Sequence, residues 1–154
     1  MRKEFLLILL LFVCHQSAMA QRERVDFKTR GAAPLRKFEY HQPSNFEVVN
    51  GKFNASLSAT NGYLFEIVGL PAKLIKCRAK FTANQFKVVL IDGLLDKTYV
   101  SNQNSRGTLR INCLPDGSFE LMYLGEIFKE NLKVNVSATL VGTINHSREL
   151  KTTK

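Results

Sequence analysis

The stretch that decides the fold is residues 132–140, LKVNVSATL, in which apolar and polar residues alternate without a break. The apolar positions are Leu132, Val134, Val136, Ala138 and Leu140. The positions between them are Lys133, Asn135, Ser137 and Thr139. A period of two residues is that of a β-strand with one face buried and the other in water. The sequence therefore predicts a strand here, with its apolar face on a hydrophobic core.

The same alternation recurs through most of the chain. It is present at residues 52–59, 74–81 and 107–114. Turn-forming residues separate the runs, with NG at positions 61–62 and PDG at positions 115–117. No run has the 3.6-residue period of an amphipathic helix. These patterns predict a mainly β fold, an antiparallel sheet or β-sandwich of about seven strands with one disulfide.

Composition divides the chain into four segments. Residues 1–20 have the pattern of a secretory signal peptide, and residues 21–44 are charged and interrupted by proline and glycine. The second segment is therefore predicted to be a flexible basic arm. The alternating residues 45–147 form the predicted antiparallel β domain, and residues 148–154 form a polar tail.

The signal-peptide prediction rests on three features of the first segment. Arg2 and Lys3 precede an apolar run at residues 5–13, and Ala18 and Ala20 have the spacing of a cleavage site. The apolar run is shorter than the roughly 18 residues that cross a bilayer. We expect cleavage after Ala20 and a secreted, extracellular protein. Retention of the segment as an uncleaved anchor is the alternative.

Positive charge is the main feature of the composition. The whole chain has a formal net charge of +9, and loss of the signal peptide, with two cations and one carboxylate, leaves about +8. A basic extracellular protein is attracted to anionic surfaces such as lipid headgroups or glycosaminoglycans. The arm mixes acidic with basic residues, so no nucleic-acid partner is predicted.

The densest basic segment lies between Glu66 and Asp92, where no acidic residue occurs. The predicted basic patch consists of Lys73, Lys76, Arg78, Lys80 and Lys87. Such a patch would bind an anionic surface, with an affinity that falls as the salt concentration rises. The alternative is a solvated strand face whose lysines block the addition of a further strand.

Two cysteines remain after signal cleavage, Cys77 and Cys113. In an oxidising compartment, an even number of cysteines favours a disulfide bond. Both cysteines fall on the predicted apolar face of their strands. Lys76 and Arg78 fall on the opposite face, so neither is expected to activate Cys77 as a nucleophile. The prediction is a buried disulfide between Cys77 and Cys113, with two buried free thiols or a catalytic cysteine as alternatives.

Three N-x-S/T sequons follow the predicted signal peptide, at Asn54, Asn135 and Asn145. The strand pattern turns Asn54 and Asn135 away from the core. In a eukaryotic secretory pathway these asparagines are predicted to carry glycans.

No arrangement of reactive residues in the sequence predicts catalysis. The two histidines after the signal peptide, His41 and His146, lie in the predicted arm and near the tail, and no paired spacing of a metal site occurs. A G-x-S-x-G motif and a glycine-rich phosphate loop are also absent from the sequence. A pair of carboxylates that acts as in a glycosidase is an alternative, because the sequence does not give the distance between two carboxylates in the fold. We therefore predict no catalytic residue, no cofactor and no metal site.

Aromatic residues are frequent, with eleven Phe and four Tyr in the chain. Those predicted to face inward are Phe53, Phe65, Phe81, Phe119 and Tyr123. They could line a cavity for a hydrophobic ligand. They could equally fill a core at the packing density usual for proteins.

The order of four segments in the sequence resembles that of a known protein family. They are VGL with KLIKCRAKF, then VVLIDGL, then KTY with RGTLRI, and finally GSFELMYLGEIFKENLKVNVSATLVG. Their layout resembles that of the arthropod takeout and juvenile-hormone-binding family of secreted lipid carriers. Members of that family are much longer, and their long core helix and amino-terminal cysteine pair have no counterpart here. The resemblance implies a shortened carrier, and it transfers no binding residue to this chain.

The function expected from the sequence is that of a secreted, non-enzymatic binding protein for a hydrophobic or amphipathic small ligand. The alternative is an extracellular protein-interaction module, an immunoglobulin-like sandwich that acts at cell surfaces or in host defence. In that case the basic patch would be its contact surface.

Overall fold

The computed structural model of this chain describes residues 23–29, 38 and 43–146. The predicted signal peptide and polar tail lie outside the described residues, as does most of the predicted arm.

The described chain is mainly β-sheet, with eleven strands and two short 3₁₀ helices. The strands are β1 (Arg24–Thr29), β2 (Asn45–Val49), β3 (Lys52–Ser58), β4 (Tyr63–Pro71), β5 (Ala79–Thr82), β6 (Lys87–Asp92), β7 (Lys97–Val100), β8 (Gly107–Cys113), β9 (Phe119–Lys129), β10 (Leu132–Gly142) and β11 (Ile144–His146). The helices are η1 (Ala72–Leu74) and η2 (Ala83–Gln85). The mainly β prediction is therefore confirmed, although the strands outnumber the seven expected.

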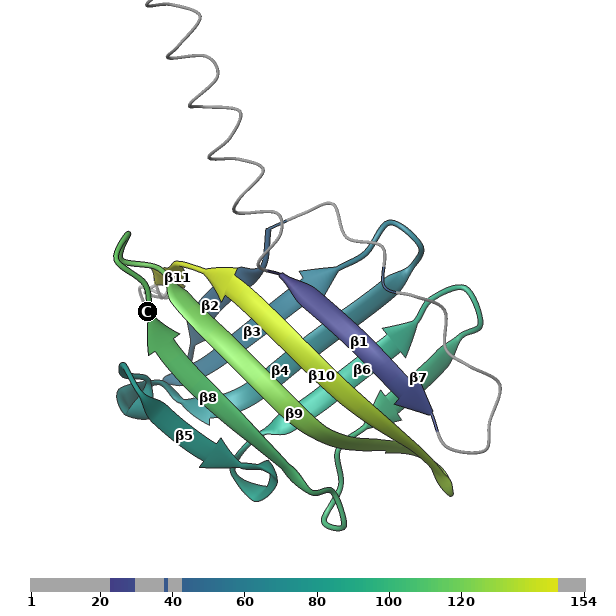
Figure 1. Cartoon of the computed structure of the whole chain (residues 1–154). Coiled ribbons are helices and arrows are strands. Elements are labelled where there is room, and N and C mark those ends of the chain that lie inside the picture. The colour runs from purple at the N-terminus through teal and green to yellow at the C-terminus, as the bar shows by residue number, and fades with distance from the viewer. Residues whose placement is uncertain (1–22, 30–37, 39–42, 147–154) are drawn as a thin grey trace, which may run out of the picture.

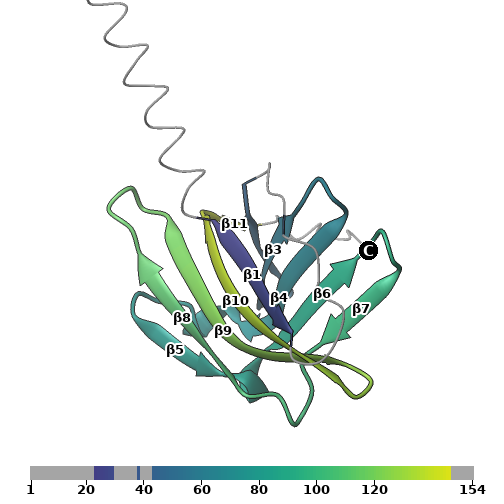
Figure 2. The same ribbon diagram turned by 45° about the vertical axis from the view of Figure 1, so that its right-hand side comes forward.

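The strands form one curled sheet with the shape of a half-barrel (Figures 1 and 2). Hydrogen-bonded neighbours follow the order β1-β10-β9-β7-β6-β4-β3-β2-β11, and β8 and then β5 branch from β9. The long strand β9 pairs with β8 along residues 119–125 and with β7 at Phe128, so the sheet divides at this strand. We call β5, β8, β9, β10 and β1 the front layer, and β2, β3, β4, β6 and β7 the back layer.

The half-barrel differs from the expected sandwich in two respects. Continuous pairing through β9 and β7 joins the front layer to the back layer, whereas a sandwich has two separate sheets. The sheet is also mixed, because β11 runs parallel to β2 while the other strand pairs are antiparallel. An immunoglobulin-like sandwich is therefore corrected to a curled half-barrel.

A single stretch of chain draws the two ends of the sheet together. Only Thr143 separates β10, in the front layer, from β11, which pairs with β2 in the back layer. At the same place the Oε1 atom of the buried Glu23 accepts hydrogen bonds from the backbone N–H groups of Ser44, at 3.0 Å, and Val141, at 3.2 Å. The Glu23 carboxylate therefore joins the starts of β1 and β2 to the end of β10.

Strand β1 lies within the segment that was predicted to be a flexible arm, so the prediction is wrong for these residues. Val25 is buried in the core, and the half-buried Phe27 packs against Phe38 and Tyr63, with ring centroids 6.3 and 5.5 Å apart. The alternation of Val25 and Phe27 is a strand signal, but charged residues surround it and the run is short. The sheet therefore begins at β1 rather than at residue 45.

The turn signals in the sequence correspond to real turns. Gly62, between β3 and β4, and Gly117, between β8 and β9, each have a φ of +83°, in the left-handed region that glycine tolerates best. A turn was expected at each of the NG and PDG motifs, and both turns are confirmed, each between two antiparallel strands.

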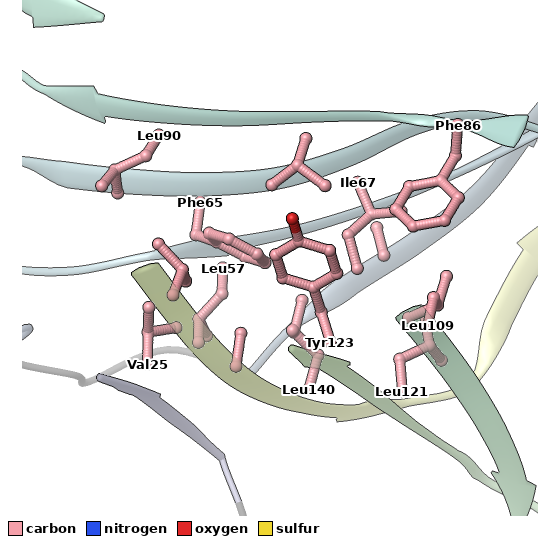
Figure 3. Packing of buried hydrophobic residues seen from close by; sticks show 14 of the residues in the cluster. Val25, Leu57, Phe65, Ile67, Phe86, Leu90, Leu109, Leu121, Tyr123 and Leu140 are labelled. Atoms are coloured by element: carbon pink, nitrogen blue, oxygen red, sulfur yellow. The ribbon is translucent and has the colours of Figure 1, made fainter. Parts of the chain in front are cut away.

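The core lies between the two layers (Figure 3). The inward face of β10 is buried as its alternation predicted, at Val134, Val136, Ala138 and Leu140. Tyr123 of β9 extends from the front layer toward the back layer, where its ring meets Phe65 at 6.1 Å and Phe86 at 6.0 Å between centroids. The predicted inward aromatics Phe53, Phe65, Phe81 and Tyr123 are buried, and Phe119 is half-buried.

Two glycines make room for the Tyr123 ring. Gly107 of β8 and Gly125 of β9 lie opposite each other in the ladder. A Cβ atom on Gly125 would lie 2.6 Å from Tyr123 Cζ and 2.8 Å from the carbonyl oxygen of Arg106. A Cβ atom on Gly107 would lie 3.1 Å from the same ring. The tyrosine ring therefore occupies the space that side chains would fill at these two positions.

Candidate functional site

A disulfide bond joins Cys77 to Cys113, as the sequence predicted. The β5–β8 ladder explains why these residues meet. Ala79 pairs with Ile111, and the cysteines lie two positions further along the same register, with their Cα atoms 5.1 Å apart. The disulfide thus continues the ladder at the point where β5 begins and β8 ends.

The predicted burial of this disulfide is wrong, because both cysteines are exposed. The phase of the alternation was right, since Ala79 and Ile111 point into the core. However, Cys77 lies in a turn before β5, where Arg78 has a φ of +63°, and Cys113 is the last residue of β8. The bond is therefore at the rim of the sheet, where no second layer covers it.

Two cations lie opposite each other on neighbouring strands of the front layer. Lys80 of β5 and Arg110 of β8 lie directly opposite each other, and both are exposed on the outer face. Like charges in this position repel, because the side chains of an opposite pair are only about 5 Å apart at Cβ. Within the described part of the chain, neither residue forms an ion pair.

The predicted basic patch is brought together only in part. Lys76 and Arg78 are exposed in the turn that holds Cys77, next to Lys80 along the chain. Lys73 is exposed in η1. Lys87 begins β6 and lies opposite Val68, so it belongs to the back layer. We define the basic cluster as Lys76, Arg78, Lys80 and Arg110.

Arg110 was absent from the predicted patch. The alternation of residues 107–114 predicts an outward side chain for Arg110, but the sequence does not show which strands are neighbours. The register supplies that information, because it pairs residue 80 with residue 110 across 30 positions of chain.

Apolar side chains lie beside the basic cluster on the same outer face. Met122 of β9 is half-buried and lies directly opposite Arg110. Leu124, two residues further along β9, is 65% exposed, the largest fraction among the exposed large hydrophobic residues of the described chain. It lies opposite Thr108 of β8 and Ser137 of β10. The outer face of β5, β8 and β9 therefore combines cations with an exposed leucine. The two carboxylates on the same face of β9 have partners, Glu120 with Asn112 and Glu126 with Lys133.

The sequon asparagines lie on the outer faces of both layers. Asn54 of β3 is half-buried, and its Oδ1 accepts a hydrogen bond from the backbone N–H of Gly69 at 3.0 Å. Asn145 of β11 is exposed, and Glu47 of β2 separates it from Asn54 in the ladder. Asn135 of β10 is half-buried on the front layer, opposite Glu126.

An ion pair lies beside Asn135 on the front layer. Lys133 Nζ contacts Glu126 Oε1 at 2.9 Å. The hydrogen bond from Lys133 lowers the pKa of the Glu126 carboxyl, and its charge and the neighbouring Arg106 act in the same direction. On the inner side, burial raises the pKa of the Tyr123 phenol, and the negative charge of Glu126 adds to this effect. These shifts accompany ordinary packing and pairing, and they single out no nucleophile or general base.

Other kinds of site are not apparent in the described residues. No group of three or more His, Cys, Asp or Glu side chains in that part of the chain is placed to hold a metal ion. None of the helices described there is long and apolar enough to cross a membrane.

The basic cluster and its apolar neighbours Met122 and Leu124 are therefore the candidate functional site. The resemblance to the takeout and juvenile-hormone-binding family stays a prediction. No protein-family model, no curated protein and no solved structure matches this chain.

Proposed function

We propose that this chain is a secreted, non-enzymatic binding protein that attaches to an anionic surface through its basic cluster. The observation that carries the proposal is the opposition of Lys80 and Arg110 on adjacent strands, with no ion-pair partner in the described chain. Two cations held together at a cost to stability are satisfied when an anion lies between or above them.

The electrostatic gain expected from the basic cluster is that of weak, reversible attachment. A cation near an anionic membrane surface gains about 1 kcal/mol, so the four residues of the basic cluster together supply about 4 kcal/mol. The position of the cluster also supports the proposal. Its side chains project from the outer face of β5 and β8 and from the turn that the disulfide anchors, so a flat or extended anion can reach them without any change in the fold.

Single substitutions with a matched control test the proposal. We expect K80T and R110T each to weaken binding to phosphatidylserine vesicles about fivefold at low salt, because each removes one favourable charge. The control is K97T, which removes the same charge from β7 in the back layer. An equal loss in K97T would show that only the net charge matters, and it would overturn the proposed site. Threonine keeps the β propensity of each position.

A second candidate function is the one expected first from the sequence, a carrier of a hydrophobic ligand. The curled sheet and the aromatic residues on its inner side favour it. Against it, the Tyr123 ring packs against both Phe65 and Phe86 between the layers, so these rings occupy the space that a ligand would need. Native mass spectrometry of protein purified from its source distinguishes the two. A stoichiometric co-purifying lipid would favour the carrier.

A further inference from the structure

The proposed function leaves open which anionic surface is bound, and the inference below rests on that function. We propose that the surface is a phospholipid bilayer and that Leu124 enters it while the basic cluster contacts the headgroups. We call the outer face of β5, β8 and β9 the docking face.

The ladder fixes the arrangement of the docking face. One row across the strands consists of Lys80, Arg110 and Met122, and the next row consists of Thr82, Thr108 and Leu124. Adjacent strands lie about 4.8 Å apart, and alternate residues along a strand about 7 Å apart. Leu124 is therefore within about 10 Å of Arg110 and projects on the same side of the sheet.

The exposure of Leu124 favours a bilayer over a sulfated polysaccharide. A polysaccharide recognises cations and hydroxyl groups, and it gains nothing from a leucine that is 65% exposed. A bilayer offers anionic headgroups above an acyl boundary, into which apolar side chains partition. Charge and apolar exposure on one face are the two signals that stable peripheral attachment requires.

The alternative apolar feature of the molecule does not meet this requirement. Leu94 and Leu95 are exposed at the turn between β6 and β7. The turn lies at the opposite end of β6 from Lys87, and the exposed Asp96 and the half-buried Lys97 follow the leucines. With one carboxylate and one cation beside them, these leucines lie in a turn without net positive charge, so the turn supplies a control rather than a second docking site.

The experiment measures partition onto phosphatidylcholine vesicles that contain an increasing fraction of phosphatidylserine. We expect wild-type affinity to rise with the phosphatidylserine fraction and to fall with salt. L124T should lower the affinity about fivefold, because part of a leucine side chain no longer leaves water. L95T removes an equally hydrophobic group from the far turn and should leave the affinity unchanged.

The same variants are then tested on immobilised heparin, as a soluble sulfated polyanion. The bilayer inference expects L124T to bind heparin as wild type does. If L124T and wild type partition equally onto vesicles while R110T is weakened on both surfaces, the bilayer inference is overturned and the proposed function stands. If R110T matches wild type on both surfaces, the proposed function itself is overturned. Unchanged melting temperatures show that the variants are folded.

Discussion

The carboxylate of Glu23 accepts a hydrogen bond from the backbone N–H of Val141 at 3.2 Å, across 118 residues of chain. The same oxygen accepts a second bond from Ser44, at 3.0 Å. One side chain thus satisfies two buried backbone donors where β1, β2 and β10 meet. Loss of such an acceptor costs more than the bond itself, because the donors stay buried.

We expect E23A to lower the free energy of unfolding by about 2–3 kcal/mol, because two N–H groups lose their acceptor. E23Q keeps a carbonyl oxygen at the same position and should cost about half as much. Urea unfolding of both variants measures the difference. Equal losses in E23A and E23Q would contradict the role of the acceptor oxygen.

The glycine opposite Gly107 is predicted to be intolerant of a side chain. G125A should destabilise the fold by about 3 kcal/mol, because the new Cβ would overlap the Tyr123 ring and force one of the two to move. The control is G51A. Gly51 has a φ of +70° but open space around it, so alanine there should cost only about 1 kcal/mol of backbone strain. Thermal unfolding of the two variants compares the effects, and equal losses would contradict the steric explanation.

The disulfide is expected to stabilise the fold although it lies at the rim. It closes a loop of 36 residues, so C77S/C113S should lower the free energy of unfolding by about 4 kcal/mol on the chain-entropy estimate. Because both cysteines are exposed, a small phosphine should reduce the bond in the folded protein. Thiol labelling at low denaturant detects this. Labelling only after global unfolding would contradict the exposure of the bond.

Stability is expected to fall at alkaline pH because of Tyr123. Its pKa is raised above the usual value of 10.0 by burial and by Glu126, so the folded chain holds a proton that the unfolded chain releases. This contribution is complete below pH 10 and is lost as the pH rises above it. Unfolding curves between about pH 8 and about pH 11 should show a smaller loss in Y123F than in wild type. Identical curves would show that other groups cause the alkaline loss.

A glycan on Asn135 would reduce binding through the docking face. Asn135 is two residues along β10 from Ser137, which lies opposite Leu124. A glycan at this position would therefore extend over the exposed leucine. Protein secreted from a glycosylating host as N135Q should bind anionic vesicles more tightly than the glycosylated wild type. N145Q removes the sequon of β11, beside β2 of the back layer, and should have no effect on vesicle binding.

The strands could be predicted from the sequence because their signal is local. The inward positions of β3, β8 and β10 follow directly from alternation, as Leu57, Leu109 and Val136 show by their burial. Strand β1 was missed because two apolar residues among charges carry too little signal. Its stability depends on pairing with β10, more than 100 positions away in the chain.

The candidate site could not be predicted in full because it depends on which strands are neighbours. Lys80 was assigned correctly to an outward face, but its proximity to Arg110 is a property of the β5–β8 register. The exposure of Cys77 was missed for a related reason. Alternation gives the direction of a side chain relative to the sheet, and it does not show where the second layer ends.

The antiparallel pairing of β1 with β10 gives the chain a defined mechanical weakness. The first residue of β1 pairs with Thr139, near the end of β10, so the start of the described chain lies beside its carboxyl-terminal strands. A force that pulled Glu23 away from Val141 would act on the β1–β10 residue pairs one after another and would peel β1 from the sheet. Under tension, this edge strand would detach while the disulfide still held the opposite rim of the front layer.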